Sequence, residues 1–397
     1  MPNRAQFLAS AHAPLRRPLT LALASAFGVA ASFAQAATIA VTSPGDSDPV
    51  AGTGTCTLRQ AINTLNHGSA ASAGEGGCRL IASGTFGVAD TIAFDTGSFP
   101  HGASNRITLA YGRLDVGNAD LVIDAAANGN VTIDAHHASG IINDSTPVGA
   151  LLTLNHLTLS DANVTANDCN GYAQGGAICI PFANLDMTAS TISGNSATWG
   201  GGIYSRAGNI TLSASTLSGN SAANAGGAIY SHFGDIALVN STLSGNAATK
   251  GGAIYASNSD ITLASSTVSA NSASDSGGAL YSEFGNVRAS DSILAGNSQG
   301  SGSDVFGIVP TGSGNLIGAV ENLKLGALAD NGGPTWTMLP QAGSVAIDAI
   351  DCTGAPAMDQ RVALRPDPGN ASATPCDIGA AEANSVFDRI FADGFDP

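Results

Sequence analysis

The chain has 397 residues, with 14 Lys or Arg against 30 Asp or Glu, so its formal net charge is −16. Only 11% of its residues are charged and 50 are Gly, whereas an average soluble domain has roughly 25% charged residues and about 7% Gly. This composition argues against coiled coils and helical bundles. The acidic excess also makes nucleic acid a poor partner, because phosphates would be repelled.

Residues 1–36 have the pattern of a secretory signal peptide. Three arginines precede an apolar run over residues 19–33, which ends at the small-residue site Ala34-Gln35-Ala36. We therefore predict an exported protein whose mature chain starts near Ala37. No later stretch approaches the 18 or so uninterrupted apolar residues that a spanning helix needs, so no transmembrane span is predicted in the mature chain.

Residues 37–105 are predicted to form an N-terminal cap region. Thr57-Leu58-Arg59-Gln60 is a capping box, and it opens an apolar stripe at helical spacing that ends at Leu65. Since the terminal repeats of a solenoid need a cover, we expect this helix to cap the N-terminal end of the repeats that follow.

Residues 106–318 carry a repeat that is irregular at first and regular from Ile178 on. A hexapeptide of the type Ser-Thr-x-Ser-Gly-Asn recurs every 25 or 26 residues, and a Gly-Gly-x-Ile/Leu motif recurs in the same register. Apolar and polar residues alternate over short runs that Gly and Asn interrupt, which indicates about three short strands in each unit. Such units must stack to bury a core, so the sequence predicts an all-β, right-handed parallel β-helix with about 25 residues per coil.

Three rows of apolar residues are expected to fill the interior of the coils. The rows are Ile192/Leu217/Leu243/Val268/Leu294, Ile203/Ile229/Ile254/Leu280 and Ile210/Ile236/Ile261/Val287. Residues 319–397 lose the period and are rich in Pro, Gly and Asp, so they are predicted to form an irregular C-terminal region and tail.

The six cysteines fall into three couples that are close in sequence. Because an exported chain meets an oxidising compartment, we predict three local disulfides rather than a thiolate metal site. The couples are Cys56 with Cys78, Cys169 with Cys179, and Cys352 with Cys376.

Several segments resemble known families of exported bacterial proteins. Cys56-Thr-Leu-Arg-Gln-Ala61 resembles the Cys-Ser-Leu-Arg-Glu-Ala box of the CSLREA-domain proteins, from which Thr57 and Gln60 depart. The Gly-Gly-Ala-Ile and Ser-Gly-Asn repeats are similar to those of polymorphic outer-membrane and pectin-lyase-like β-helix proteins. The motifs that resemble the choice-of-anchor Q domain are Leu328-Ala-Asp-Asn-Gly-Gly-Pro-Thr335, Ala346-Ile-Asp348, Asp359-Gln-Arg361, Arg365-Pro366 and Cys376-Asp-Ile-Gly379.

The resemblance implies a right-handed parallel β-helix that is displayed on the outer-membrane surface or released outside the cell. It also implies that residues 319–397 form a choice-of-anchor Q-like region and tail. These families are surface proteins of undefined activity, so the resemblance implies a fold and a location more than a reaction.

The repeated Asn and Asp residues have two interpretations each. The asparagines of the hexapeptide are expected to stack as a ladder of side-chain amides, in preference to any ligand role; they are Asn195, Asn220, Asn246, Asn271 and Asn297. Asp235 and Asp260 would lie one coil apart, at about 5 Å, where the two carboxylates could hold a calcium ion. The alternative is that both simply bond backbone N–H groups of turns.

A row of tyrosines is the candidate binding site. Tyr204, Tyr230, Tyr255 and Tyr281 each follow an inward apolar residue, so they should face outward, with His232 beside them. An outward aromatic row with polar neighbours suits a polysaccharide or a partner strand. The alternative is that later parts of the chain cover the row.

A second outward array consists of hydroxyls. Its threonines are Thr191, Thr216, Thr242 and Thr267, and its serines are Ser193, Ser218, Ser244 and Ser269. Such faces resemble ice-binding surfaces, but hydrogen bonding between neighbouring strands accounts for them equally well.

Taken together, these features favour an adhesive or recognition role towards polysaccharide or a surface partner, with no cofactor required. The alternative is a polysaccharide lyase or glycoside hydrolase, which would need clustered carboxylates or a base with calcium. Asp235 and Asp260 form the only acidic pair on successive coils that the sequence offers, so enzyme activity is the weaker interpretation.

Overall fold

The computed structural model describes residues 36–47, 55–68, 78, 80–82, 86–87, 89–117, 120–165, 169, 174–300, 303–365 and 375–383. The predicted signal peptide therefore lies almost entirely outside the described residues, as does the end of the tail. Within the described part, the regular structure is nearly all β-strand; the helical elements there are α1 (Leu58–Asn66) and the short 3-10 turn η1 (Ala126–Asn128).

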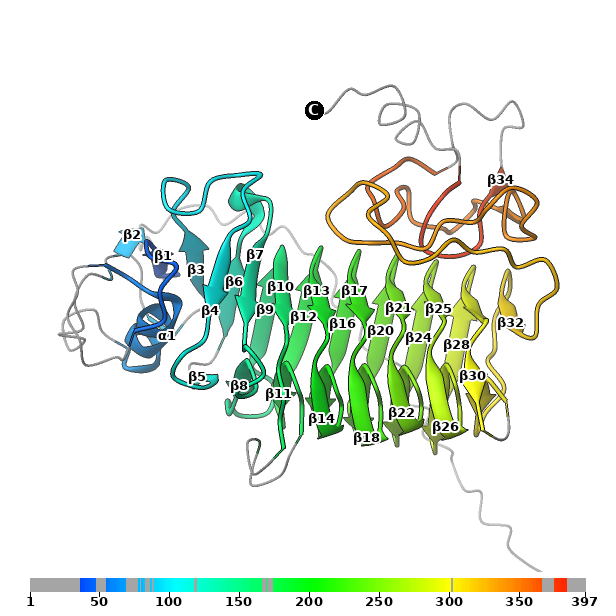
Figure 1. Ribbon diagram of the computed structural model, residues 1–397, viewed down its shortest axis with the longest axis horizontal. Coiled ribbons are helices and arrows are strands. Elements are labelled where there is room, and N and C mark those ends of the chain that lie inside the picture. Colours follow the sequence, from blue (N-terminus) through cyan, green and yellow to red (C-terminus); the bar gives the residue numbers. More distant parts are fainter. Residues whose placement is uncertain are drawn as a thin grey trace, which may run out of the picture. The chain divides into compact units, whose positions relative to one another are not determined.

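Successive coils place their strands in four parallel sheets, which confirms the predicted β-solenoid (Figure 1). The first sheet has the order β2 (Leu80–Ala82), β1 (Thr38–Val41), β3 (Asp90–Phe94), β6 (Leu121–Asp124), β9 (Leu151–Asn155), β12 (Asn184–Thr188), β16 (Ile210–Ser213), β20 (Ile236–Val239), β24 (Ile261–Ala264) and β28 (Val287–Ser290). Within it, β1 and β2 pair antiparallel, whereas β1 and β3 pair in parallel.

The second sheet has the order β32 (Leu316–Gly318), β29 (Ile293–Ala295), β25 (Thr267–Ser269), β21 (Thr242–Ser244), β17 (Thr216–Ser218), β13 (Thr191–Ser193), β10 (Leu157–Ser160), β7 (Val131–Asp134) and β4 (Arg106–Thr108). The third has the order β31 (Val305–Phe306), β27 (Leu280–Glu283), β23 (Ile254–Ser257), β19 (Ile229–His232), β15 (Ile203–Ser205), β11 (Ile178–Ile180), β8 (Ile142–Asp144) and β5 (Leu114–Val116).

The fourth sheet was not predicted. It consists of β14 (Ser196–Trp199), β18 (Ser221–Ala225), β22 (Ala247–Lys250), β26 (Ser272–Ser276) and β30 (Ser298–Gln299). The expectation of about three strands per coil was therefore wrong for the regular coils, which have four. The fourth strand lacks the alternation of large apolar and polar residues on which the prediction depends. Its buried positions are small residues, such as Ala222 and Ala225.

The register of the coils follows the sequence repeat. Ile203 pairs with Ile229, Ile229 with Ile254, and Ile254 with Leu280. All members of the three predicted inward rows are at most 1% exposed. Burying such side chains contributes about 1.5–3 kcal/mol each, so these rows are the main source of stability of the coils.

The Gly-Gly motif permits close contact between coils. Gly226 has φ +68°, a left-handed conformation that favours glycine, and a Cβ on the following Gly227 would lie 2.1 Å from the carbonyl oxygen of Gly252. A side chain at Gly227 would push successive coils apart, and one at Gly226 would clash with the carbonyl oxygen of Ile229 in its own coil, 2.3 Å away.

Two ladders of polar side chains run through the core of the regular coils. The side-chain amide of Asn220 donates to Oδ1 of Asn246 at 2.9 Å, and the same contact joins Asn195 to Asn220, Asn246 to Asn271, and Asn271 to Asn297. A second ladder uses the first serine of the hexapeptide, whose hydroxyl accepts the backbone N–H of the serine one coil before, as in Ser215 to Ser241 at 3.2 Å. The second ladder was not predicted, although its serines recur at the first position of the hexapeptide.

Helix α1 begins at the predicted capping box. Thr57 and Gln60 exchange side-chain to backbone hydrogen bonds of 3.0 and 3.2 Å, and Leu58, Ile62 and Leu65 belong to the same buried core as the coils. Arg59 forms an ion pair with Asp46. The capping role of the helix and the right-handed winding of the coils stay predictions. Within the part of the chain that the structure describes, no helix has the length and hydrophobicity to cross a bilayer.

All three predicted disulfides form, joining Cys56 to Cys78, Cys169 to Cys179, and Cys352 to Cys376. After β32 the chain is largely irregular, with a short antiparallel pair of β33 (Ile350–Asp351) and β34 (Pro375–Cys376). Ile378 and Ala346 of this C-terminal region pack against Ile293 and Ala295 of β29.

Candidate functional site

The C-terminal region binds to the outer face of the second sheet. Thr216, Thr242 and Thr267 do point outward as predicted, but they are at most 1% exposed, because residues of the C-terminal region cover them. The hydroxyl of Thr216 donates to the carbonyl oxygen of Trp336 at 2.6 Å, and that of Thr267 accepts the N–H of Ala380 at 3.0 Å. The threonine row is thus a docking surface over these coils, which removes them from any ice-binding face.

Gln360 makes the central contact of this docking. Its side chain is fully buried. The Gln360 amide donates to the hydroxyls of Thr216 and Thr335 at 2.8 and 2.9 Å, while its Oε1 accepts the hydroxyl of Thr242 at 2.6 Å. The segment that carries Thr335 and Trp336 is thereby fixed on the sheet by side chains that water does not reach.

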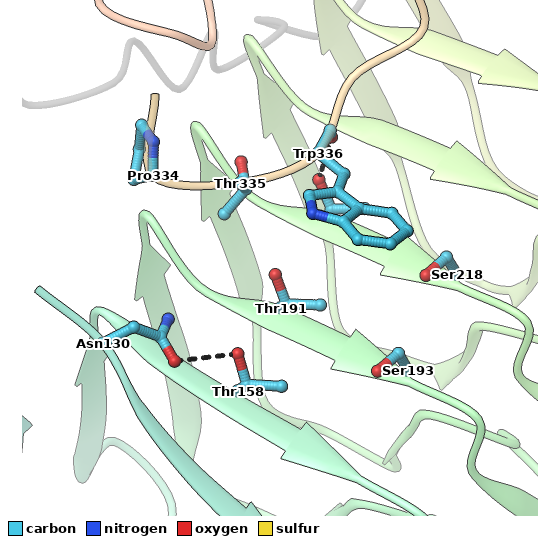
Figure 2. A pocket seen from close by; sticks show the side chains of 9 residues that line it. Asn130, Thr158, Thr191, Ser193, Ser218, Pro334, Thr335 and Trp336 are labelled. Carbon is cyan, nitrogen blue, oxygen red and sulfur yellow. Dashed lines mark hydrogen bonds between the residues drawn. The ribbon is translucent and has the colours of Figure 1, made fainter. Parts of the chain in front are cut away.

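A groove of about 340 Å³ lies where the C-terminal region stops covering the sheet (Figure 2). Its floor is formed by outward residues of β10, β13 and β17, which stand in register one coil apart. The lining residues are Asn130, Thr158, Thr191, Ser193, Thr216, Ser218, Pro334, Thr335 and Trp336. Figure 2 shows the indole of Trp336 extending from the C-terminal segment over the floor towards Ser218.

Trp336 has a large apolar side chain, yet the residue is 55% exposed to solvent. Its backbone carbonyl oxygen accepts hydrogen bonds from Thr216 and Gln360, so its backbone is held against the sheet. At the other end, Thr158 donates to Oδ1 of Asn130 at 3.0 Å. The groove combines one aromatic surface with hydroxyl and amide groups, and none of the described residues that line it has a titratable side chain.

The predicted tyrosine row forms a continuous stack on the third sheet. The ring centroids of Tyr204, Tyr230, Tyr255 and Tyr281 follow each other at 5.3, 5.0 and 5.2 Å, and Phe306 extends the stack at 4.7 Å. Because each ring covers the faces of its neighbours, the row offers edges and hydroxyls rather than flat ring faces.

The two ends of the tyrosine row are buried and its middle is half-buried. Tyr204 and Tyr281 are 8% and 7% exposed. Tyr204 packs with the Cys169–Cys179 disulfide, and Trp199 of β14 makes an edge contact with Tyr230 at 5.3 Å. The covering groups thus include the fourth sheet and the disulfide. At the other end of the row, the cover comes from a later part of the chain, because Phe306 stacks on Tyr281.

His232 lies beside the row and contacts Phe233, with ring centroids 4.0 Å apart. In the register of the strands, His232 pairs with Ser257 and Ser257 with Glu283. Glu283 hydrogen-bonds the hydroxyl of Tyr255, and burial together with this carboxylate raises the pKa of Tyr255 well above its usual value. Burial, with Tyr204 and Glu283 nearby, raises the pKa of Tyr230 to about 12.

Replacing Glu283 by glutamine is therefore expected to shift part of the tyrosine titration to lower pH. The substitution removes a negative charge that opposes ionisation of Tyr255 and Tyr230. Tyrosinate absorbance during a base titration measures the shift, with exposed Glu321→Gln as the matched control. Superimposable curves for the wild type and Glu283→Gln would show that Glu283 does not act on the row.

Asp235 and Asp260 belong to a further ladder on the protein surface. Oδ1 of Asp235 accepts the backbone N–H of Asp260 at 2.9 Å, and Oδ1 of Asp260 accepts that of Asn286 at 2.8 Å. Asp260 accepts hydrogen bonds from both the backbone and the side-chain amide of Asn286, and these two bonds are the main reason that its pKa is lowered. Arg288, which contacts Oδ2 of Asp260 at 3.2 Å, makes a smaller contribution. No group of three His, Cys, Asp or Glu side chains suited to a metal ion occurs among the described residues.

The groove beside Trp336 is the site that the sequence did not reveal. The hydroxyl rows were visible as an outward array, but the aromatic wall comes from the C-terminal region, 120 residues after Thr216. The signal for this site that the sequence does contain is a single tryptophan, Trp336, in the segment that follows the repeats.

Three segments of the chain match the model of the Chlamydia polymorphic membrane protein repeat, at residues 189–206, 214–232 and 240–257. Each segment runs through a ladder asparagine and the Gly-Gly motif to the strand that carries a tyrosine of the row. No curated protein and no solved structure matches the chain.

Proposed function

We propose that the protein is displayed on the bacterial outer surface, or released from it, and binds polysaccharide in the groove beside Trp336. Three lines of support concern its location. The matched repeats are named for polymorphic membrane proteins, the chain forms disulfides as exported proteins do, and residues 1–36 read as a signal peptide. The resemblance of the C-terminal motifs to the choice-of-anchor Q domain fits surface display.

The observation that carries the binding proposal is the half-exposed indole at the edge of a strip of hydroxyls. Sugars present apolar C–H faces and many hydroxyls, so they bind where an aromatic ring lies next to groups that both donate and accept. The fixed backbone of Trp336 lowers the entropy that binding must overcome. The tyrosine row fits a sugar less well, because its ring faces are stacked on each other.

The chemistry of the lining supports binding rather than cleavage. A hydrolase needs two placed carboxyl groups and a lyase needs a base, whereas the described groove residues carry hydroxyls, amides and an indole. We therefore expect no new reducing or unsaturated ends when the mature protein is incubated with plant, bacterial and host polysaccharides, with or without calcium. Turnover that is lost in Asp235→Asn would instead support the enzyme alternative.

Trp336→Ala is expected to weaken binding to the polysaccharide that the wild type retains from that panel by about ten-fold or more, as removal of a central aromatic contact does. Isothermal titration calorimetry measures the change. The matched control is Tyr111→Ala, since Tyr111 is similarly exposed at 56%. If the double variant Tyr230→Ala with Tyr255→Ala loses binding while Trp336→Ala retains it, the tyrosine row is the site and the groove is not.

A further inference from the structure

The turn that leads from the third sheet to the first carries an exposed phenyl ring in alternate coils. The register of the strands places one residue of each coil at the same position of this turn. In chain order, these residues are Phe182, Ala207, Phe233, Asn258 and Phe284. Phe233 and Phe284 are 60% and 86% exposed, and Phe182 is 37% exposed. We call this row of five residues the phenyl ridge.

Part of the phenyl ridge has a backbone conformation that phenylalanine rarely adopts. Phe233, Asn258 and Phe284 have φ +68°, +53° and +60°, in the left-handed region that suits Asn and Gly but is unfavourable for a bulky side chain. Strained residues tend to persist where they have a function. Two exposed rings on such a backbone therefore indicate a contact surface.

Large and small side chains alternate along the phenyl ridge. Coils stack at about 4.8 Å, so Phe233 and Phe284 lie about 10 Å apart along the solenoid, with Asn258 between them. Val309, which is 82% exposed, extends the row in the same turn of the last coil. A second ridge that runs in the opposite direction fits this alternation, because Phe233 then meets the partner's Asn258 and Phe284 meets the partner's Ala207. A parallel ridge would instead place each ring against its own equivalent.

The charges beside the phenyl ridge favour the same antiparallel arrangement. The residues that precede the ridge positions in four successive coils are Arg206, His232, Ser257 and Glu283. If the two-fold axis passes between the coils of Phe233 and Asn258, Arg206 meets the partner's Glu283, which is a complementary pair.

On the opposite side of the phenyl ridge, this arrangement brings Asp235 towards the partner's Asp260. Arg288 contacts the carboxylate of Asp260 at 3.2 Å within the chain. Asp235 would therefore meet an ion pair rather than a lone carboxylate, which limits the repulsion.

We propose that two copies of the protein associate antiparallel along their phenyl ridges, in a symmetric dimer. A second copy is favoured over a membrane, because the net charge of −16 opposes contact with anionic lipid headgroups. A single row of side chains buries less than the roughly 800 Å² per partner of a standard interface. We therefore expect a weak dimer, with a dissociation constant on the order of 10 µM.

Phe233→Asn combined with Phe284→Asn is the decisive variant, because Asn258 already holds the same backbone conformation in the coil between them. Sedimentation velocity is measured on the mature protein, from well below to well above the expected dissociation constant. The wild type should convert from monomer to dimer, and the double variant should stay monomeric. Its Tm should be no lower than that of the wild type, which excludes unfolding as the cause. Tyr111→Asn, which removes a ring that is 56% exposed elsewhere, is the control and should dimerise as the wild type does.

Crosslinking tests the antiparallel register. The cysteines of the chain are all in disulfides, so Arg206→Cys and Glu283→Cys each introduce one free thiol. A short bismaleimide should link the two variants to each other when they are mixed. It should not link either variant to itself, because the two copies of residue 206 would lie three coils, or about 15 Å, apart.

Three results would overturn the proposal. The first is a wild type that stays monomeric at the highest concentration; if this monomer binds phosphatidylcholine vesicles and the double variant does not, the phenyl ridge contacts lipid instead. The second is a double variant that dimerises as strongly as the wild type, which would place the interface elsewhere. The third is crosslinking within each cysteine variant but not between the two, which would mean that the copies pair in another register.

Discussion

Asn246→Ala is expected to lower the free energy of unfolding by about 3–9 kcal/mol, since three buried groups lose their partner at about 1–3 kcal/mol each. Oδ1 of Asn246 accepts the backbone N–H and the side-chain amide of Asn220, at 3.0 and 2.9 Å. Its own amide donates to the carbonyl oxygen of Leu217 at 2.9 Å. Alanine can replace none of these bonds, and water does not reach the fully buried position.

Asn209→Ala is the matched control, because it removes an asparagine from the surface ladder of a neighbouring coil. Oδ1 of Asn209 accepts the N–H of Asp235 at 2.9 Å, but this ladder is exposed to solvent, so water replaces the bond and the loss should stay below about 1 kcal/mol. Denaturation midpoints followed by circular dichroism compare the variants. Equal losses in Asn209→Ala and Asn246→Ala would mean that the buried ladder contributes no more than an exposed turn.

The repeat in the sequence predicts the inward positions of the coils well, for a physical reason. Ile203, Ile229 and Ile254 alternate with polar residues on a strand and recur at one spacing, so only one stacked register buries them all. Asn246 recurs in the same register and must therefore stack on its equivalents. The alanine-lined fourth strand gives no such contrast between large apolar and polar residues, and alternation alone failed to predict it.

The binding groove depends on contacts that no local pattern encodes. Thr242 meets Gln360 across 118 residues of sequence, and the same docking brings Trp336 to the sheet. Alternation predicts that Thr216 and Tyr230 point outward, but it cannot predict what then covers them. Only the docked C-terminal region turns an exposed hydroxyl row into a buried interface on one side and a groove on the other.

The docked C-terminal region contains a buried group of ionisable side chains in which acidic groups outnumber basic ones. Asp359, Asp377 and Glu382 face Arg361 and Arg365, and all five are at most 6% exposed. Arg361 pairs with Asp359 at 2.9 Å, and Arg365 pairs with Glu382. Asp348 adds negative charge near Asp377, and Asp291 lies near Arg365. Three carboxylates against two guanidinium groups leave one buried charge that a proton can neutralise.

Raising the pH from 5 to 9 is therefore expected to loosen the C-terminal region. Burial, partly offset by Arg365, raises the pKa of Glu382 to about 8, and burial raises that of Asp377 to about 6. Both pKa values lie above those of the same groups in the unfolded chain. At any pH between the unfolded and the folded pKa of a group, the folded state therefore binds more protons. The resulting stabilisation is fully present below the unfolded pKa values and is lost as pH rises through about 6 and then about 8. The loss is on the order of 4 kcal/mol.

The fluorescence of Trp336 in a Trp199→Phe background reports this change, because the chain has 2 tryptophans and Trp336 sits where the C-terminal region meets the sheet. We expect the urea midpoint of this single-tryptophan protein to be lower at pH 9 than at pH 5. The midpoint should change less when Glu382→Gln is added, because residue 382 then no longer titrates. The exposed Glu321→Gln is the control and should behave as the wild type does. If the midpoint is the same at pH 5 and pH 9, the carboxyl groups are ionised throughout this range and the arginines, not protons, balance their charge. In that case the docking that fixes Trp336 would be insensitive to pH, and so would polysaccharide binding in the groove.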